Sequence, residues 1–400
     1  MTRCPIAHCK QHRPDAPAFS SLAYRAFDEL IQKFCAPLHS ISAPYIAFIP
    51  KPTPLHLAFF FAAWRMGKTL YPLSFRLPSI QSRLEKTQAH YIDPDTLPLS
   101  TPFVQPDIDD NLLATLIETS SSAKIACHFF KSHRISAQIT IEALNLKPDD
   151  AYCLSLPLFH ISGIALFLRC FTAGARLLFP EEKHLATHIS MVPTQLYRLR
   201  EPLPKLKCLL VGGAPLPKTL PTSYPIYATY GMTECASMAA LNTTFLPHIE
   251  WKIASDGELF LRGPSLLYKY WDQEPRQSDE WFATRDIAHF DGKLQILGRK
   301  DRQFISGGEN IQPEEIEKAL LDIPHVIEAR VEPVPDAEFG MRPIAQIYSE
   351  ESLSPESIQE KLEETLPRFK IPSNIEVSAK PLKKSKPILE SESLVPSPSK

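Results

Sequence analysis

Two pairs of adjacent glycines stand out in a chain that has only 13 glycines among 400 residues. Gly212 and Gly213 end the apolar run "CLLVGG", and Gly307 and Gly308 occur in "SGGENIQPEEIE", just before a helix start. Glycine adopts positive φ angles easily and lets the backbone approach a ligand closely. Each pair therefore predicts either a turn or a close approach to a bound molecule.

A second segment, "YATYGMTE" (227–234), combines residue types that suit a nucleotide. It offers an aromatic face at Tyr230, a hydroxyl at Thr233 and a carboxylate at Glu234. Hydroxyls suit phosphate oxygens, and a carboxylate suits Mg²⁺ that keeps most of its waters. These residues indicate a nucleotide site, and ordinary strand-to-helix turns are the alternative.

The N-terminal residues Cys4, His8, Cys9 and His12 include zinc-ligand types. No second Cys/His pair lies nearby to complete a tetrahedral site, so we expect a flexible N-terminal arm instead. The chain has eight scattered cysteines and no visible secretory signal, which predicts free thiols.

Strand-like runs alternate with helical patterns through the first two thirds of the chain, which predicts an α/β fold with mostly parallel, helix-covered sheets. Ligands of such sheets bind beyond the carboxyl ends of the strands, where the first glycine pair and "YGMTE" fall. Asp-Gly dipeptides introduce two expected hairpin strands. The expected strands are 45–49, 151–157, 187–193, 207–213, 224–231, 256–263 and 291–302, and the expected buried helices are 55–67 and 161–173.

The pattern changes after "GRKDR", where a helix beginning near Pro313 and strands at 326–334, 343–349 and 374–379 indicate a small α+β unit. We expect an N-terminal domain at 1–299, a C-terminal domain at 300–390 and a disordered tail at 391–400, with the boundary at Arg299–Asp301.

Composition excludes two classes of partner. A net charge of −2 and a pI of about 6.7 argue against a nucleic-acid-binding surface. The longest apolar runs, 55–64 and 161–171, are too short to span a bilayer, so we expect no transmembrane segment and a cytoplasmic protein. Self-association as a homo-oligomer stays open.

Three segments taken together resemble the AMP-forming acyl/aryl-CoA ligases: "LPLFHISG", "YGMTE" and "ATRDIAHFDGKLQILGRKDRQFISGGENIQPEEIE". The resemblance covers about 45–386. "HISMVPTQLYRL", "LLVGGAPLP" and "WFATRD" are similar, more closely, to the o-succinylbenzoate–CoA ligases of menaquinone biosynthesis.

The resemblance implies a large N-terminal domain, a small C-terminal domain that rotates, and small-molecule substrates. ATP, Mg²⁺ and coenzyme A would be required. The substrate carboxylate would attack the α-phosphate of ATP and release pyrophosphate, and the thiol of coenzyme A would then displace AMP from the acyl-adenylate. The first step turns a carboxylate, which is a poor acyl donor, into a mixed anhydride with a phosphate leaving group.

The resemblance also implies residue roles. Thr233 would contact the α-phosphate, Glu234 would hold Mg²⁺, Tyr230 would pack on adenine and Asp286 would bind the ribose. The further residues implied for ATP are Thr119, Ser120, Ser121, Ser122, Lys124, Gly213, Ala214, Pro215, Thr229, Gly231 and Arg299. Those implied for the acyl pocket are His160, Ser162, Gly163, Arg169 and Ser190; those for coenzyme A are Gly307, Gly308 and Glu309; the hinge is Asp301.

Arg169 offers a check that depends on chemistry, because it is the lone charge in "ISGIALFLRCF". A desolvated guanidinium needs an anionic partner, and o-succinylbenzoate carries a second carboxylate that does not react. The alternative is that the side chain extends from a helix end to solvent.

Two segments depart from the family pattern. The phosphate-binding loop, "TSSSAK" (119–124), has no glycine, so its backbone wraps less freely around pyrophosphate, and we expect weaker ATP binding or a slow enzyme. The catalytic lysine falls in "KPLKKSKPILE", where Lys386 takes the role after a one-residue shift and Lys383 and Lys384 compete for it.

These departures leave two alternatives open. One is a degenerate or repurposed homologue that binds a nucleotide or an acyl group with little turnover. The other is a ligase for a different aromatic or fatty acid.

Overall fold

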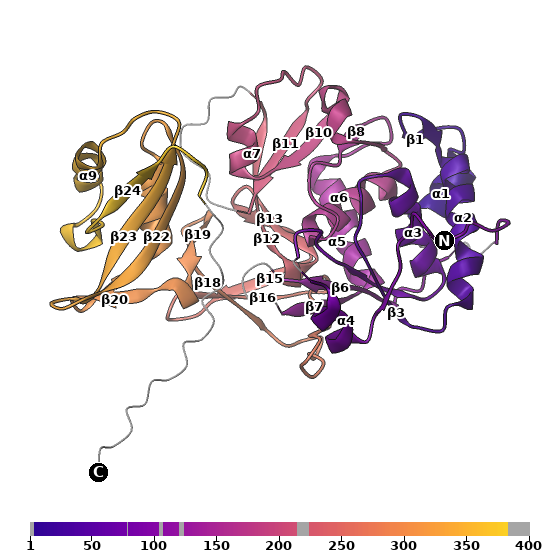
Figure 1. Ribbon diagram of the computed structural model, residues 1–400, viewed down its shortest axis with the longest axis horizontal. Coiled ribbons are helices and arrows are strands. Elements are labelled where there is room, and N and C mark those ends of the chain that lie inside the picture. The colour runs from indigo at the N-terminus through magenta and orange to yellow at the C-terminus, as the bar shows by residue number, and fades with distance from the viewer. Residues whose placement is uncertain (1–3, 78, 104–106, 120–123, 214–223, 383–400) are drawn as a thin grey trace, which may run out of the picture.

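The computed structural model describes residues 4–77, 79–103, 107–119, 124–213 and 224–382 (Figure 1). Its first large sheet has six strands in the order β17-β7-β6-β4-β3-β5. The strands β5, β3, β4 and β6 run parallel, whereas β7 pairs antiparallel with β6 and β17 pairs antiparallel with β7. Their bounds are β3 (Tyr45–Phe48), β4 (Thr69–Pro72), β5 (His90–Tyr91), β6 (Leu113–Glu118), β7 (Ile125–Phe129) and β17 (Lys269–Tyr270).

The second large sheet has seven strands in the order β14-β13-β12-β11-β10-β8-β9, and it is parallel from β9 to β12. Its predicted strands at 151–157, 187–193, 207–213 and 224–231 are confirmed, and the α/β fold class with them. The bounds are β8 (Ala151–Cys153), β9 (Arg176–Leu178), β10 (His188–Met191), β11 (Cys208–Gly212), β12 (Ile226–Met232), β13 (Ser237–Leu241) and β14 (Thr244–Phe245).

Two apolar helices fill the space between these sheets, α3 (Pro54–Arg65) and α6 (Ile161–Thr172) (Figure 1). Every residue from His56 to Arg65 is buried, and Phe60 packs on Phe167 with ring centroids 5.2 Å apart. A helix that is covered on all sides needs no polar face, which explains why both segments read as continuous apolar runs. The remaining helices of this part are α2 (Tyr24–Ser40), α4 (Gln81–Thr87), α5 (Phe130–Leu144) and α7 (Pro193–Tyr197).

A four-stranded antiparallel sheet follows, in the order β15-β16-β18-β19. It contains the two hairpins that the Asp-Gly dipeptides predicted, and both are confirmed. The bounds are β15 (Glu250–Ile253), β16 (Glu258–Arg262), β18 (Phe282–Phe290) and β19 (Leu294–Arg299).

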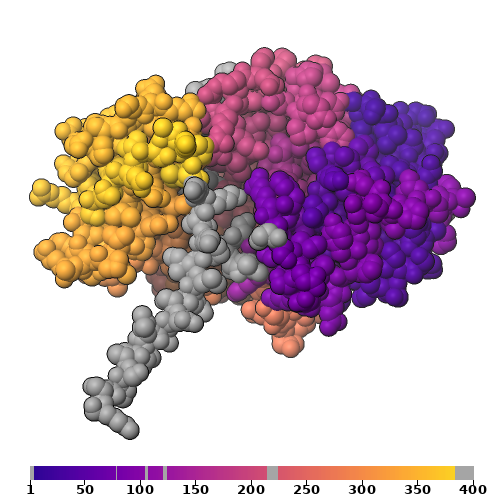
Figure 2. Space-filling model, in the orientation of Figure 1, coloured from indigo at the N-terminus to yellow at the C-terminus, as the bar shows by residue number. Residues whose placement is uncertain are grey.

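Residues 304–382 form a lobe of their own, coloured orange to yellow in Figure 1 and Figure 2. One apolar cluster, which includes Ile316, Val331 and Ile347, consists only of residues from this lobe. Its elements are β20 (Phe304–Ser306), β21 (Glu309–Ile311), α8 (Pro313–Leu321), β22 (Val326–Asp336), β23 (Gly340–Ser349), α9 (Pro355–Glu363) and β24 (Ile375–Ser378). The expected tail at 391–400 lies outside the described residues.

The expectation of a flexible N-terminal arm is wrong. Residues Pro5–His12 form helix α1, and Cys4 and Cys9 are buried. The Cys9 thiol donates to the carbonyl of Phe171 at 3.4 Å, and Arg65 donates to the sulfur of Cys4 at 3.2 Å. Tertiary packing against α6 and α3 therefore orders a segment whose own sequence is too short and polar to indicate a helix.

The cysteines are free, as the sequence predicted, and all of them are buried. Among the described residues, the only group of three side chains placed to share a metal ion is His56, Asp93 and Asp95. A search of the same residues also finds no helix with the length and hydropathy needed to cross a membrane.

Asp28 anchors helix α2 through a buried ion-pair cluster. Its carboxylate pairs with Arg65 at 2.5 Å and with Lys10 at 2.7 Å, and it accepts from Gln32 at 2.6 Å. Burial alone would raise the pKa of Asp28, but the two cations together hold it below its ordinary value. This stabilisation is present above the ordinary aspartate pKa and is lost as the pH falls through the folded-state pKa.

We predict that Asp28→Ala lowers the free energy of unfolding by about 3–5 kcal/mol, because it leaves the Arg65 guanidinium buried and unpaired. Urea denaturation followed by circular dichroism measures the change. Asp15→Ala is the matched control, since Asp15 pairs with Arg25 at the surface and its loss should cost less than about 1 kcal/mol. Equal losses in the two variants would contradict the assignment.

Candidate active site

A wide cavity of about 1910 Å³ opens where the carboxyl ends of β10, β11 and β12 meet strands β18 and β19. This is the edge of the sheet at which the sequence places a ligand. The predicted site residues that line the cavity are Thr119, Lys124, His160, Ser162, Arg169, Ser190, Gly213, Thr229, Tyr230, Gly231, Thr233, Glu234, Asp286, Arg299 and Asp301.

Other predicted residues do not line it, or cannot be placed. Gly163, Gly307, Gly308 and Glu309 are described but lie outside the lining. Ser120, Ser121, Ser122, Ala214, Pro215, Lys383, Lys384 and Lys386 lie outside the described residues.

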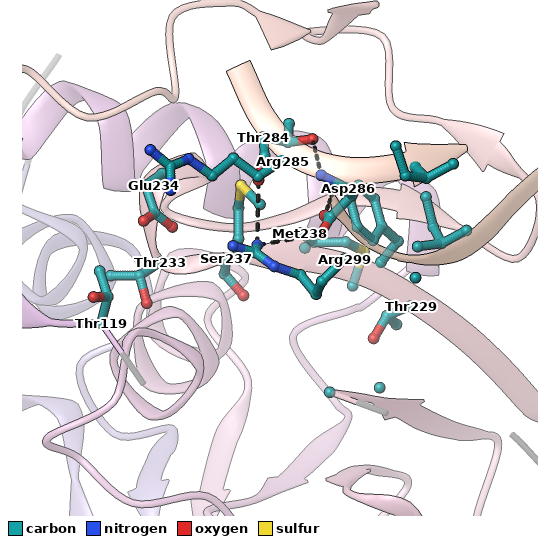
Figure 3. Close-up of a pocket in the computed structure, with 18 of the residues that line it drawn as sticks. Thr119, Thr229, Thr233, Glu234, Ser237, Met238, Thr284, Arg285, Asp286 and Arg299 are labelled. Carbon is teal, nitrogen blue, oxygen red and sulfur yellow. Dashed lines mark hydrogen bonds and ion pairs between the residues drawn. The ribbon is translucent and has the colours of Figure 1, made fainter. Parts of the chain in front are cut away.

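A hydrogen-bonded chain of four side chains lines one wall of the cavity, and Figure 3 shows two of them, Asp286 and Arg299. The hydroxyl of Tyr230 donates to Asp286 at 2.6 Å, and Arg299 donates to the other oxygen of Asp286 at 3.2 Å. Arg299 also donates a hydrogen bond to each carboxylate oxygen of Asp301, at 3.1 and 2.9 Å. The chain ties the end of β12 to the residue at the expected domain boundary.

Two opposing effects act on the acid at the centre of this chain. Burial raises the pKa of Asp286, while the hydrogen bonds from Tyr230 and Arg299 partly offset the rise. The phenol and the guanidinium hold the carboxylate in a fixed orientation that faces the cavity. Sequence reasoning expected Tyr230 to supply an aromatic face, and it missed the hydroxyl's bond to Asp286.

Glu234 lies at the opposite end of the cavity, in the short 3₁₀ turn η2 (Thr233–Cys235) that follows β12 (Figure 3). It accepts a hydrogen bond of 2.7 Å from the hydroxyl of Tyr270. The ammonium group of Lys124 lies 4.9 Å from the centroid of the Tyr270 ring. Tyr270 therefore joins the predicted carboxylate to the predicted lysine, and sequence reasoning missed it.

The turn that carries Glu234 is tightly constrained. A Cβ atom on Gly231 would lie 1.8 Å from the carbonyl oxygen of Ser237, so only glycine fits there. After the turn, Ala236 and Ser237 have φ angles of +52° and +110°, which side chains disfavour. The hydroxyl of Ser136, in α5, donates to the carbonyl of Ala236 at 3.0 Å and stabilises this conformation.

The first glycine pair has two separate explanations. A Cβ atom on Gly212 would lie 2.1 Å from Oγ1 of Thr229 on the neighbouring strand, so Gly212 permits close packing. Gly213 instead has a φ angle of +84°, which turns the chain away at the end of β11.

At the inner end of the cavity, Arg169 is only 3% exposed. Its Nε donates to the carbonyl of Ala165 at 3.1 Å, and its terminal nitrogens have long contacts of 3.5 Å to Tyr152 and 3.4 Å to Ser237. Within the described part of the chain it pairs with no carboxylate. The alternative that Arg169 extends to solvent is therefore wrong, and its charge faces the cavity.

Hydroxyl groups surround this guanidinium. The phenol of Tyr152 and the hydroxyl of Ser190 are hydrogen-bonded at 2.8 Å, and both are buried. Together with Ser237, they form a small polar pocket around one fixed positive charge. Sequence reasoning found Arg169 and Ser190, whereas Tyr152 in β8 and Ser237 at the start of β13 carry no local signal.

His160 precedes the first residue of α6, where it lines the cavity beside Ser162. Its ring lies 4.5 Å from that of Phe159. Gly163, one turn into the helix, is set back from the cavity because a Cβ there would lie 2.1 Å from the carbonyl oxygen of Pro157. Gly163 therefore permits close packing against Pro157, and its predicted contact with the acyl group stays a prediction.

The second glycine pair forms the tip of the β20–β21 hairpin. Gly307 and Gly308 have φ angles of +57° and +87°, and a Cβ on Gly307 would lie 2.9 Å from the Phe339 ring. Nothing lies within 4 Å of a Cβ placed on Gly308. The turn accounts for both glycines locally, and Gly308 leaves open space beside it.

Known proteins resemble this chain in sequence and in fold. Residues 119–271 match the AMP-binding enzyme family. The 2-succinylbenzoate–CoA ligases (o-succinylbenzoate is the same compound) of Salmonella typhimurium and Escherichia coli are each 38% identical to it over 65% of this chain. That match spans 63% of the length of both relatives. The 2-succinylbenzoate–CoA ligase of Bacillus mycoides is 30% identical over 69% of this chain and 68% of its own length.

Solved structures extend the similarity over nearly the whole chain. An arginine-to-lysine variant of Escherichia coli MenE with bound OSB-AMS has a TM-score of 0.85 and 28% identity, and it covers 94% of each chain. The o-succinylbenzoate coenzyme A synthetase of Bacillus subtilis in complex with ATP and magnesium has a TM-score of 0.81 at 23% identity, over 94% of this chain and 95% of its own, which shows the fold alone. These findings confirm the predicted resemblance, and the chain belongs to the 2-succinylbenzoate–CoA ligase family of AMP-binding enzymes.

Proposed function

We propose that this chain joins o-succinylbenzoate to coenzyme A in two steps, through an acyl-adenylate, and releases pyrophosphate and AMP. One observation carries the proposal: the buried guanidinium of Arg169, which pairs with no described carboxylate, opens onto the cavity that Asp286 and Glu234 line. A dianionic aromatic acid is the substrate that would neutralise such a charge and still present a second carboxylate to a nucleotide. The ligases named above act on the same acid.

The nucleotide would lie along β12. Asp286, held by Tyr230 and Arg299, offers a carboxylate that accepts two ribose hydroxyls. Gly213 follows the end of β11, and Thr229 lies within the neighbouring strand β12; the adenine would pack beside them, together with one face of Tyr230. The backbone turn at Thr233 brings its hydroxyl towards the α-phosphate.

The oxygen donors around Glu234 fit a magnesium ion. Its carboxylate and the hydroxyls of Thr119 and Thr233 line the same end of the cavity, and Mg²⁺ prefers such oxygen ligands alongside retained waters. A bound Mg²⁺ would neutralise phosphate charge. Tyr270 orients the carboxylate through its 2.7 Å hydrogen bond, which leaves the other carboxylate oxygen to face the cavity.

In the first step, a carboxylate oxygen of the acid attacks the α-phosphorus, and the bond from this phosphorus to the bridging oxygen breaks. Arg169, Ser190 and Tyr152 hold the other carboxylate, so the reacting one is fixed in position. Lys124 lies at the phosphate end, where it offsets negative charge. Lys386, which we predicted to be the catalytic lysine, lies outside the described residues.

In the second step, the thiolate of coenzyme A attacks the acyl carbon and AMP leaves. We propose that residues 300–390 turn about Asp301 to bring Gly307, Gly308 and Glu309 against the pantetheine arm, while His160 borders the acyl group. A separate apolar core in this lobe supports the proposal. Ion pairs from its Glu328 and Glu350 to Arg198 and Arg200 are partly exposed, and such pairs contribute little to holding it in place.

A cytoplasmic location fits the free and buried cysteines, which a reducing compartment would preserve. Self-association stays a prediction.

The proposal is tested by pyrophosphate release from the purified protein with ATP, Mg²⁺ and o-succinylbenzoate, without coenzyme A. We expect release that depends on the acid, followed by thioester when coenzyme A is added. A panel of benzoate, fatty acids and aryl acids distinguishes a ligase of other specificity. Release with none of these acids would indicate a homologue that has lost turnover.

We predict that Arg169→Ala raises the KM for o-succinylbenzoate roughly 10- to 100-fold, because a charged hydrogen bond to the unreactive carboxylate is lost. Arg169→Lys should recover part of the affinity, since it keeps the charge without the planar pair of donors. Steady-state kinetics of both variants and of the surface control Arg25→Ala measure this. An unchanged KM in Arg169→Ala would exclude the proposed contact.

We predict that Gly308→Leu slows thioester formation at least about tenfold more than adenylation, because its side chain would occupy the open space that the pantetheine arm needs. Each half-reaction is followed separately, with supplied acyl-adenylate for the second. Gly292→Leu is the matched control: Gly292 also has a positive φ angle, +93°, and open space around it, but lies in the β18–β19 turn. Equal losses in both half-reactions would count against this role.

A further inference from the structure

Strand β18 has a bulge beside the cavity, and one residue in it has an unusual conformation. Ile287 pairs with Glu258 and Ala283 pairs with Phe260, so residues 284–286 of β18 lie opposite Leu259 alone. Arg285, in the middle of the bulge, has a φ angle of +61°. Bulges next to active sites redirect side chains, and left-handed residues other than glycine persist only where their surroundings impose them.

The neighbours of Arg285 impose this conformation. The hydroxyl of Thr284 donates to the carbonyl of Leu259 at 2.7 Å and accepts from the amide of Asp286 at 3.0 Å. The amide of Arg285 itself donates to the carboxylate of the buried Glu258 at 3.2 Å. The backbone is thus fixed on both sides of Arg285, while its side chain is exposed.

The bulge sends adjacent side chains to different parts of the cavity. Asp286 turns towards Tyr230 and Arg299, whereas Figure 3 shows the guanidinium of Arg285 extending towards Glu234. A regular strand would not bring both charges of this dipeptide into one cavity in this way, since its successive side chains point to opposite faces.

The guanidinium of Arg285 has no partner among the residues that the structure describes. Throughout the described ranges it forms no hydrogen bond and no ion pair, although it lines the cavity. Two other arginines of the lining have partners. Arg299 forms ion pairs with Asp286 and Asp301. Arg276 donates hydrogen bonds to the carbonyls of Leu267 and Glu280. Arg285 therefore combines a strained backbone with a positive charge that has no partner among the described residues. It lies at the end of the cavity that Glu234 and Lys124 line.

We propose that Arg285 binds the terminal phosphates of ATP and the pyrophosphate that leaves, an inference that rests on the proposed function. When the α-phosphorus forms its bond to the substrate carboxylate, the electron pair of the broken phosphorus–oxygen bond departs with the β-phosphate. A guanidinium offers two parallel donors to that developing charge. This contribution matters in a chain whose phosphate-loop sequence, "TSSSAK", has no glycine.

Two variants test the proposal, because glycine accepts a positive φ angle and Arg285→Gly should fold at least as well as the parent. We expect Arg285→Gly to raise the KM for MgATP and, in the reverse reaction of acyl-adenylate with pyrophosphate, the KM for pyrophosphate, each roughly 10- to 100-fold. Arg285→Lys should recover part of both. Thioester formation from supplied acyl-adenylate should keep its rate and its KM for coenzyme A.

The control is Gln88→Gly, which relieves the same kind of backbone strain at a φ angle of +54°, at a residue outside the cavity lining, and should leave all these constants unchanged. Unchanged constants for MgATP and pyrophosphate in Arg285→Gly would overturn the proposal. A selective rise in the KM for coenzyme A would also overturn it, because the cation would then serve the phosphates of that molecule.

A binding measurement separates this test from the proposed function. Calorimetry of the full chain with MgATP and with AMP needs no turnover, and Arg285→Gly should weaken MgATP but leave AMP unchanged. If wild-type protein releases no pyrophosphate, the proposed function fails, yet this comparison still decides the role of Arg285. Equal weakening of MgATP and AMP would refute it.

Discussion

A buried guanidinium that has no acid partner in the described part of the chain is the constraint around which this site is organised. Arg169 is 3% exposed, and its long contacts to Tyr152 and Ser237 cannot compensate the loss of water around a full charge. Its environment therefore favours a ligand that brings a carboxylate of its own. The fold places the other charges of the site along the same cavity. Helix α6 carries Arg169 at the inner end of the cavity, and β12 leads to Glu234 at another part of the lining.

Close packing places these charges with little freedom. Gly231 and Gly212 allow β12 to approach its neighbours at distances that any side chain would prevent. Ser237 in β13 and Arg285 in the bulge of β18 have positive φ angles. Strain of this kind is typical of residues selected for a ligand, because the surrounding hydrogen bonds must hold them against their own preference. Ser237 contacts Arg169, and Arg285 extends towards Glu234.

Much of the fold could be predicted from the sequence, because parallel strands and buried helices leave continuous apolar runs such as 161–171. The site residues that could be predicted stand in short motifs, Glu234 in "YGMTE" and Arg169 alone in an apolar helix. Tyr270 could not be predicted, since it reaches Glu234 only because β17 pairs with the distant strand β7. The N-terminal helix was missed for a similar reason: its stability comes from contacts with α3 and α6.

The most direct test of the central claim is a crystal structure of the protein with a stable analogue of the o-succinylbenzoyl-adenylate. The account predicts that the free carboxylate of the acyl group lies within hydrogen-bonding distance of the Arg169 guanidinium and of Ser190. It also predicts that the ribose hydroxyls contact Asp286. An acyl group bound elsewhere, with Arg169 still lacking an anionic partner, would contradict it.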